Sequence, residues 1–151
     1  MRFAVIDLGT NTFNLLIGEV DAKKTNFIKL FNYKIPVKLG EKSINLGYIA
    51  DVPFERGINA LLKFKEHING YNIENVFAFA TSAIRSASNG NDFVEQAFKH
   101  TQIKISVIDG NEEADLIYYG NKISFFISIY YRNFYLSMFK CLFYKIGRAH
   151  V

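Results

Sequence analysis

The first twenty residues constrain the fold more than any other part of the chain. An apolar run, Phe3–Leu8, contains one charged residue, Asp7, and is followed by the turn-forming sequence GTNT at 9–12. A second apolar run spans Phe13–Glu19. Apolar runs of this length are typical of buried strands, and a short polar turn between two of them predicts an antiparallel hairpin. The chain is therefore expected to open with a strand–turn–strand unit that begins a sheet.

The rest of residues 1–120 predicts strands that alternate with helices. A third strand is expected at 26–33, a loop over 34–52, and a helix from Pro53 to Ile68 that stops near Gly70. The later elements expected are a strand at 74–81 buried on both faces, helices through 88 and over 92–100 with Ser82 and Asn91 as caps, a strand at 104–108 and a helix at 111–119. This order indicates an α/β domain with a mixed sheet and flanking helices.

The composition changes abruptly after Gly120. The next 25 residues contain nine aromatic side chains and no Asp or Glu. Three interpretations stay open: a transmembrane helix, which Arg132 and Lys140 interrupt; an apolar helix or strand pair of the domain; and a shifted reading frame, which in AT-rich DNA yields Phe, Ile, Lys, Asn and Tyr. The closing KIGRAHV resembles a translated sequencing-library adapter. We therefore expect residues 1–120 to form the domain and 121–151 to be an aberrant hydrophobic, basic tail.

Charge and cysteine content exclude several classes of protein. The formal net charge is +4, but it is −1 for residues 1–120 and +5 for residues 121–151. The folded part therefore carries no excess of basic residues that would indicate a nucleic-acid or membrane partner. One cysteine, Cys141, excludes a disulfide framework and a cysteine-based zinc site. Asp7 inside the first apolar run argues against a signal peptide, so the expected location is the cytoplasm.

Asp7 and the turn after it form the first candidate binding site. The expected strand brings one carboxylate to its end, and Gly9, Thr10, Asn11 and Thr12 follow with short side chains and converging backbone N–H groups. Such a concave set of donors suits a phosphate group, and Asp7 suits a divalent cation or an attacking water. The alternative is an ordinary hairpin in which Asp7 bonds the backbone of its own turn.

The sequence TSAIR at 81–85 is the second candidate. It directly follows an expected strand, and a helix that starts there offers an anion the N–H groups that lack partners within the helix. Arg85 has the planar set of donors that suits phosphate oxygens. The alternative is a capped helix start with a solvated arginine that pairs with a nearby acid.

Two adjacent glutamates, Glu112 and Glu113, open the last expected helix. A carboxylate that faces a phosphate is what a general base for water attack requires. Adjacent helix positions point about 100° apart, so no more than one of the pair faces a given site. The alternative is surface charge that complements the positive end of the helix dipole.

In their order along the chain, four segments resemble one known family. They are AVIDLGTNTFNLLIGEV, PVKLGEKSINLGYI, FAFATSAIRSASNGNDF and ISVIDGNEEADLIYYG, and the resemblance covers about residues 3 to 120. The chain is similar to the exopolyphosphatase / guanosine pentaphosphate phosphohydrolase family of the actin-like ATPase superfamily. The resemblance implies the first, N-terminal lobe of such a protein, with a ribonuclease-H-like fold. It also implies a hydrolase that releases the terminal phosphate from inorganic polyphosphate or guanosine pentaphosphate.

The resemblance further implies roles for individual residues. Asp7 and residues 9–12 fall on the family's first phosphate-binding loop, where Asp7 would hold Mg²⁺ directly or through water. Arg85 falls on the arginine that contacts the scissile phosphate, and Glu113 falls on the general base, which also faces the metal. Lys38 stands where arginine is commoner. The implied cofactor is Mg²⁺, the implied substrates are polyphosphate or guanosine pentaphosphate, and full-length relatives are implied to be homodimers.

A second glycine-rich phosphate loop of the family, DIGGGS-like, has no counterpart in residues 121–151. A phosphoryl group would be held from one side, so the chain as written is expected to be truncated, with little or no hydrolytic activity. The alternative function is a nucleotide- or phosphate-binding module of the same superfamily that does not hydrolyse its ligand. A third is an interaction domain or gene fragment without a ligand.

Overall fold

The computed structural model describes residues 1–20, 27–41, 43 and 46–112. The chain divides into two compact units, Met1–Ile108 and Asp109–Val151, and each is described by itself. The predicted general base, Glu113, lies outside the described residues. The predicted tail and the predicted boundary at residue 120 also lie outside them, so both stay predictions.

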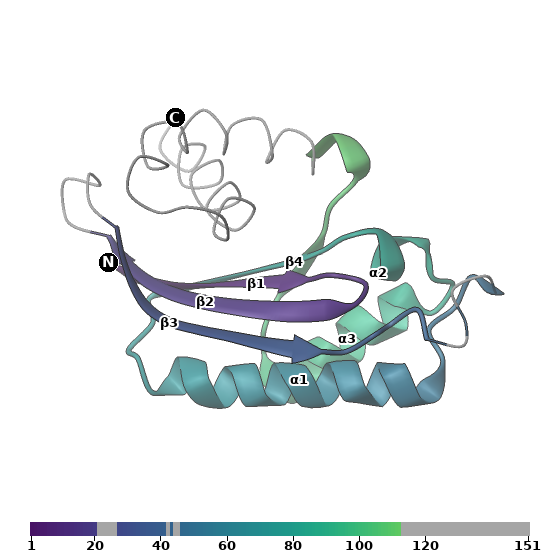
Figure 1. Cartoon of the computed structure of the whole chain (residues 1–151), viewed down its shortest axis with the longest axis horizontal. Helices are drawn as coiled ribbons and strands as arrows, with labels where there is room; N and C mark the ends of the chain where they lie inside the picture. The colour runs from purple at the N-terminus through teal and green to yellow at the C-terminus, as the bar shows by residue number, and fades with distance from the viewer. Residues whose placement is uncertain (21–26, 42, 44–45, 113–151) are drawn as a thin grey trace. The chain divides into compact units, whose positions relative to one another are not determined.

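Five strands form one mixed sheet in the order β3-β2-β1-β4-β5 (Figure 1). The predicted hairpin is present: β1 (Arg2–Leu8) pairs with β2 (Thr12–Val20) in antiparallel fashion, and β3 (Phe27–Pro36) extends the antiparallel side. On the other side of β1, β4 (Asn75–Ala80) and β5 (Ile105–Val107) run parallel to it. Parallel neighbours require crossover connections, and helices supply them here. The predicted mixed sheet with flanking helices is confirmed.

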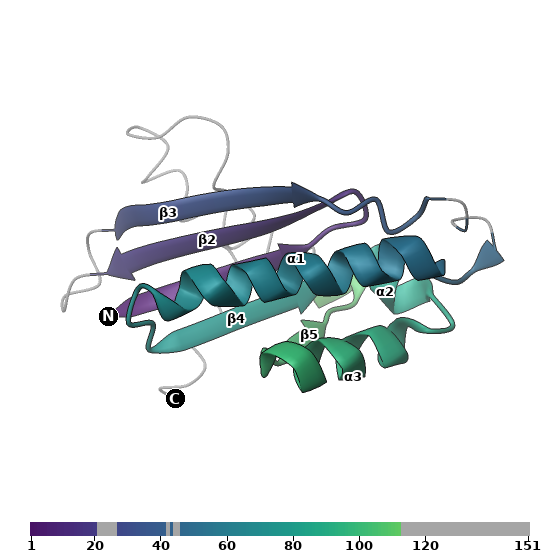
Figure 2. The same cartoon turned by 90° about the horizontal axis from the view of Figure 1, so that it is seen from below.

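Helices α1 (Asp51–Asn69) and α3 (Gly90–Thr101) lie on the same face of the sheet, and the short α2 (Ser82–Ser86) precedes α3 (Figures 1 and 2). Pro53 lies in the first turn of α1 and Gly70 caps its end, as predicted. No helix within the described residues combines the length and the apolar character that crossing a bilayer needs.

The main core lies between the sheet and these two helices. Alternate residues of β1 and β2 pack there against the buried side of α1 and α3; the strands contribute Ala4, Ile6, Leu8, Leu15 and Ile17, and the helices contribute Ala60, Leu61, Phe64, Phe93 and Ala97. Gly57 allows the helices to approach closely, because a Cβ there would lie 2.7 Å from a ring carbon of Phe93. The core thus fixes the helices against the strands that carry the candidate site.

The other face of the sheet is where Asp7 projects. Phe3 and Val5 alternate with the core residues of β1 and are also buried. Successive side chains of a strand point to opposite faces, so Asp7 continues the series of Phe3 and Val5. The apolar run of β1 is therefore buried on both faces, with one carboxylate at its end.

Strand β3 is longer than the sequence predicts. It continues to Pro36, although a loop is expected from residue 34. Tyr33 and Ile35 pack against the main core, and Thr12 of β2 pairs with Pro36, so the antiparallel ladder extends to the hairpin turn. Pro36 is tolerated because it is the last residue of β3 and because β3 is an edge strand.

The prediction that the strand at 74–81 is buried on both faces is wrong for its first half. Asn75 and Val76 are exposed, whereas Ala78–Ala80 are buried. Strand β5 pairs with Ala78–Ala80, so the first half of β4 has β1 as its neighbour on one side and no β5 residue on the other. The apolar composition of the segment did not reveal how short the neighbouring strand is.

Both predicted helix caps after β4 are wrong. Ser82 is the first residue of α2 and follows Thr81 at the N-cap position, and Asn91 lies inside α3, which begins at Gly90. Asn89 occupies the N-cap position of α3, but its side chain bonds elsewhere. Its Oδ1 accepts from the backbone N of Ile49 and its Nδ2 donates to the carbonyl oxygen of Ile49, both at 2.8 Å. Asn89 therefore joins α3 to the loop before α1.

Replacing Asn89 with alanine is expected to destabilise the protein by about 2 kcal/mol, because two partly buried backbone groups of Ile49 lose their partner. Urea denaturation measures the change. Asn91→Ala is the matched control: Asn91 is exposed in the first turn of the same helix. Its replacement should change the stability by less than about 0.5 kcal/mol. Equal effects of the two substitutions would contradict the assignment.

Candidate functional site

The hairpin turn between β1 and β2 is closely packed against itself. The last residue pair of the ladder is Leu8 with Phe13, so Gly9 begins the turn directly after the buried end of β1. A Cβ at Gly9 would lie 2.9 Å from the carbonyl oxygen of Thr12, closer than such contacts normally occur. Glycine at this position is therefore required by the close approach of the backbone.

The segment Val37–Leu39 is hydrogen-bonded to the hairpin turn. The backbone N–H groups of Val37 and Lys38 both donate to the carbonyl oxygen of Asn11 at 2.9 Å, and that of Leu39 donates to the carbonyl oxygen of Thr10 at 2.8 Å. Lys38 has a φ of 49°, in the left-handed region that a residue with a side chain seldom adopts. No local pattern indicates this contact, because Val37, Lys38 and Leu39 lie 26, 27 and 29 positions beyond their partners and the expected loop has no periodicity.

Asp7 is the next-to-last residue of β1 and is partly buried. It pairs with Asn14 across the hairpin, and Nδ2 of Asn14 donates to Oδ2 of Asp7 at 3.2 Å. This hydrogen bond fixes one carboxylate oxygen towards β2. The alternative was that Asp7 bonds the backbone of its own turn. Oδ2 of Asp7 instead accepts from a side chain of β2.

The start of α2 lies beside the hairpin turn. Strand β4 ends at Ala80, which pairs with Leu8, so Ser82 follows at the same edge of the sheet as Thr10. Their hydroxyl oxygens are 3.4 Å apart. The structure therefore brings together the first two candidates predicted from sequence, although 72 positions separate these residues.

Arg85 is exposed near the end of α2. Its backbone N–H donates to the carbonyl oxygen of Thr81 at 3.0 Å, and its Nη1 donates to the carbonyl oxygen of Ile108 at 2.7 Å. The backbone N–H of Ile108 in turn donates to the carbonyl oxygen of Ala80 at 3.0 Å. Arg85 thus connects α2 to the chain after β5, which limits the positions that its guanidinium can take.

A cavity of about 220 Å³ adjoins the same turn. Its lining comes from the turn, the loop before α1 and α2: Thr10, Leu39, Gly40, Gly47, Tyr48, Ile49, Ser82, Ala83, Ser86 and Ala87. None of these side chains is charged, so the cavity offers hydroxyls, backbone groups and one aromatic ring. Such a lining suits an uncharged part of a ligand better than a further phosphate.

Asp109 and Glu112 form a reciprocal cap at the start of the last predicted helix. Oδ1 of Asp109 accepts from the backbone N–H groups of Asn111 and Glu112, both at 2.8 Å, and Oε2 of Glu112 accepts from the backbone N–H of Asp109 at 3.1 Å. This is a capping box. The helical conformation begins at Gly110, one residue before the predicted start, and the spacing of Asp109 and Glu112 was the signal that could have located the cap.

The described residues offer limited means of holding a metal. Within them, no three His, Cys, Asp or Glu side chains come close enough together to bind an ion as a group. Mg²⁺ usually retains several waters and takes one or two protein carboxylates together with substrate phosphates. Asp7, a partly buried carboxylate one residue before the end of β1 and its hairpin turn, fits that requirement.

The comparisons with known proteins agree on one family. The model of the Ppx/GppA phosphatase family matches residues 16–127. The bifunctional 3-dehydroquinate synthase/phosphatase of Fusobacterium nucleatum is 36% identical over 127 residues, which cover 81% of this chain and 19% of that protein. The putative exopolyphosphatase of Haemophilus influenzae is 32% identical over 119 residues, which cover 79% of this chain and 36% of that protein.

A solved structure extends the agreement to the fold. The crystal structure of an exopolyphosphatase from Cytophaga hutchinsonii superposes with a TM-score of 0.77 at 36% identity, over 82% of this chain and 39% of that chain. This similarity confirms the predicted fold, a ribonuclease-H-like lobe of the actin-like ATPase type. The chain spans less than half the length of each of these three relatives.

Proposed function

This chain belongs to the Ppx/GppA phosphatase family, and we propose on that basis that it forms the first lobe of a phosphoanhydride hydrolase. The proposed reaction is release of the terminal phosphate from inorganic polyphosphate or guanosine pentaphosphate, in the cytoplasm. The activity is proposed for a protein in which this lobe is joined to the second phosphate loop of the family.

The observation that carries the proposal is the contact between the first two candidate binding segments. The hairpin turn and the start of α2 come within hydrogen-bonding range through Thr10 and Ser82, and Arg85 lies on the same short helix. Backbone N–H groups of a turn and an arginine next to it are the donors that phosphoryl transfer requires. In such reactions the enzyme contributes mainly positioning and charge stabilisation.

The roles of residues 9–12 and Arg85 are proposed from this arrangement, and those of Asp7 and Glu113 from the family resemblance. Residues 9–12 cradle the terminal phosphate with backbone N–H and hydroxyl donors, and Arg85 donates to its oxygens. Asp7 and Glu113 would hold Mg²⁺, which when bound neutralises charge on the phosphate oxygens. Glu113 accepts the proton of the attacking water. The capping box supports Glu113 as the base, because it engages the carboxylate of the neighbouring Glu112.

A second candidate function is a nucleotide-binding module that does not hydrolyse its ligand. The uncharged cavity beside the hairpin turn favours it. The ring of Tyr48 and the hydroxyls of Thr10, Ser82 and Ser86 are groups that can contact a sugar or a base. Both candidates place phosphate on the hairpin turn. They differ in the need for Glu113, which the first prediction of the Discussion tests.

Arg85→Ala is expected to weaken the binding of tripolyphosphate with Mg²⁺ by about 10- to 100-fold, the effect of losing one charge-assisted contact of roughly 1.5–3 kcal/mol. Isothermal titration calorimetry on the whole chain measures the affinity, and a ligand-induced rise in melting temperature confirms binding to the folded state. Lys99→Ala controls for the lost positive charge, since Lys99 is exposed in the last turn of α3. Equal losses of affinity in both variants would mean that any positive charge on the surface attracts tripolyphosphate and that Arg85 has no specific contact with it.

A further inference from the structure

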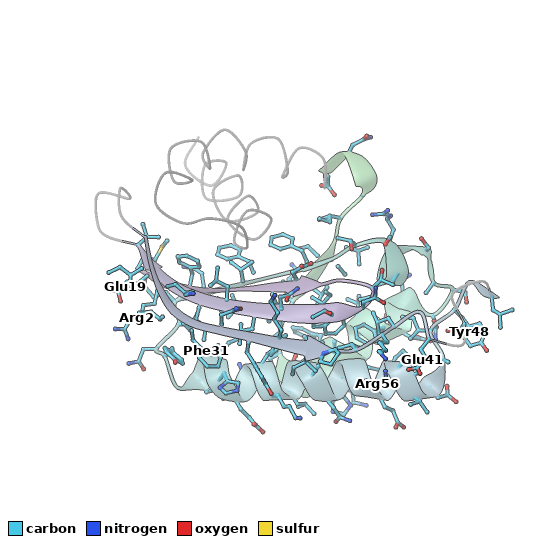
Figure 3. The ribbon with its side chains drawn as sticks, in the orientation of Figure 1. Arg2, Glu19, Phe31, Glu41, Tyr48 and Arg56 are labelled. Atoms are coloured by element: carbon cyan, nitrogen blue, oxygen red, sulfur yellow. The ribbon has the colours of Figure 1, made fainter. Side chains whose placement is uncertain are left out.

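Arg56, on α1, holds the segment that supports the hairpin turn. Its Nη1 donates to the carbonyl oxygen of Val37 at 2.8 Å, and its Nη2 donates to Oε2 of Glu41 at 2.9 Å (Figure 3). Val37 is fully buried, whereas Glu41 is exposed. One guanidinium therefore joins both ends of the segment 37–41 to the helix.

The segment 37–41 has a backbone that needs such support. Lys38 adopts a left-handed conformation, which is unfavourable for a residue with a Cβ and persists where surrounding contacts enforce it. The contacts on one side are the three hydrogen bonds to Thr10 and Asn11. On the other side, the guanidinium of Arg56 holds Val37 immediately before the left-handed residue.

These contacts also determine where the N–H groups of the turn point. In a trans peptide, the carbonyl and the following N–H point in opposite directions. The carbonyls of Thr10 and Asn11 are turned towards the segment 37–41. The N–H groups of Asn11 and Thr12 are therefore turned away from it, which is the orientation that an anion on the outer side of the turn requires.

We propose that Arg56 is a positioning residue for the phosphate-binding turn. It fixes the segment 37–41, the segment fixes the carbonyls of Thr10 and Asn11, and these set the direction of the N–H donors. The inference rests on the proposed function, because it gives the turn a phosphate to bind. Loss of Arg56 lets the turn leave its binding geometry, and the apparent affinity falls in proportion to the fraction of molecules that keep it.

Arg2 provides a matched control at the other end of the sheet (Figure 3). Its Nε donates to Oε2 of Glu19 at 3.0 Å and its Nη1 donates to the carbonyl oxygen of Tyr71 at 3.3 Å. Each arginine thus contacts one glutamate and one backbone carbonyl. Their side chains are similarly exposed, at 42% for Arg2 and 33% for Arg56. Replacing either arginine with alanine should lower the stability by a similar amount. A difference in ligand affinity between the two variants would therefore result from the location of the arginine and not from lost stability.

The experiment compares wild type, Arg56→Ala and Arg2→Ala in the whole chain, at a temperature well below the lowest melting point. Titration calorimetry with tripolyphosphate and Mg²⁺ should give a dissociation constant about tenfold higher for Arg56→Ala, equivalent to about 1.4 kcal/mol. Arg2→Ala should stay within about twofold of wild type, because it does not contact the segment 37–41. Amide hydrogen exchange should become faster at Val37, Lys38 and Leu39 in Arg56→Ala and not in Arg2→Ala.

Two further variants show which contact of Arg56 the affinity depends on. Glu41→Gln keeps the bond from Arg56 to Val37 and should change the affinity by less than about twofold, since exposed ion pairs contribute little. Arg56→Lys cannot make both contacts with one planar group and should give an intermediate affinity. It also replaces Arg56→Ala if that variant does not fold.

Equal affinities in Arg56→Ala and Arg2→Ala, or weaker binding without faster exchange at 37–39, would overturn the inference. A wild-type chain that binds no tripolyphosphate would contradict the proposed function instead. In that case the exchange rates at Asn11 and Thr12 decide whether Arg56 orients the turn: unchanged rates in Arg56→Ala would reject it.

Discussion

Replacing Glu113 with glutamine is expected to slow phosphate release from polyphosphate by about 10²–10⁴-fold, the usual contribution of a general base. Glutamine has nearly the same shape but cannot accept the proton of the attacking water. The assay uses a chimera in which residues 1–120 replace the aligned lobe of the Cytophaga hutchinsonii exopolyphosphatase. Phosphate release at saturating substrate gives the rate, and titration calorimetry gives the affinity.

Glu112→Gln is the control for this prediction. The Oε2 of Glu112 accepts from the backbone N–H of Asp109, and the amide oxygen of glutamine can accept the same bond. Its turnover should stay within about threefold of wild type. An equal loss of turnover in both variants would mean that either substitution disturbs the start of the helix, and that Glu113 is not the base. A Glu113→Gln variant of unchanged rate would favour the non-hydrolysing module.

The second large effect is expected for Gly90→Ala, which should destabilise the protein by about 3 kcal/mol or more. A Cβ at Gly90 would lie 1.9 Å from the carbonyl oxygen of Ile84 and 3.1 Å from its carbonyl carbon. These are backbone atoms, so α2 and α3 must move apart. Because Ile84 precedes Arg85, the displacement also moves the predicted phosphate contact. Thermal unfolding should show a melting temperature lower by more than about 10 °C.

Gly110→Ala is the matched control for Gly90. Both glycines occupy the first helical position after a cap residue, Asn89 in one case and Asp109 in the other. A Cβ at Gly110 would meet nothing within 4 Å. Alanine there should leave stability unchanged or raise it by up to about 1 kcal/mol, the difference in helix propensity. Similar melting temperatures for the two variants would contradict the close approach at Gly90.

Local patterns predicted most of the elements of the first unit. The two apolar runs around GTNT became the hairpin of β1 and β2, and Pro53 and Gly70 marked the two ends of α1. These features depend on neighbours within a few positions, which periodicity and turn chemistry record. The cap of Asp109 with Glu112 was also local, and its spacing could have been recognised.

The errors concern residues whose partners lie elsewhere in the chain. Asn91 looked like a cap because of its type, but Asn89 holds that position and bonds Ile49, 40 positions away. The strand at 74–81 looked buried throughout, but the shortness of β5 leaves its first half exposed. Neither outcome can be derived from the residues near the element in question.

The sequence by itself determined the α/β class, the order of strands and helices, and the two phosphate-binding candidates, because side-chain periodicity and glycine placement act over one turn or one strand. The tertiary structure decided that Thr10 contacts Ser82, that Val37–Leu39 donates three hydrogen bonds to the hairpin turn, and that Arg56 donates to the carbonyl oxygen of Val37. Each of these contacts depends on strand order and helix packing, which place residues from separate parts of the chain at one edge of the sheet.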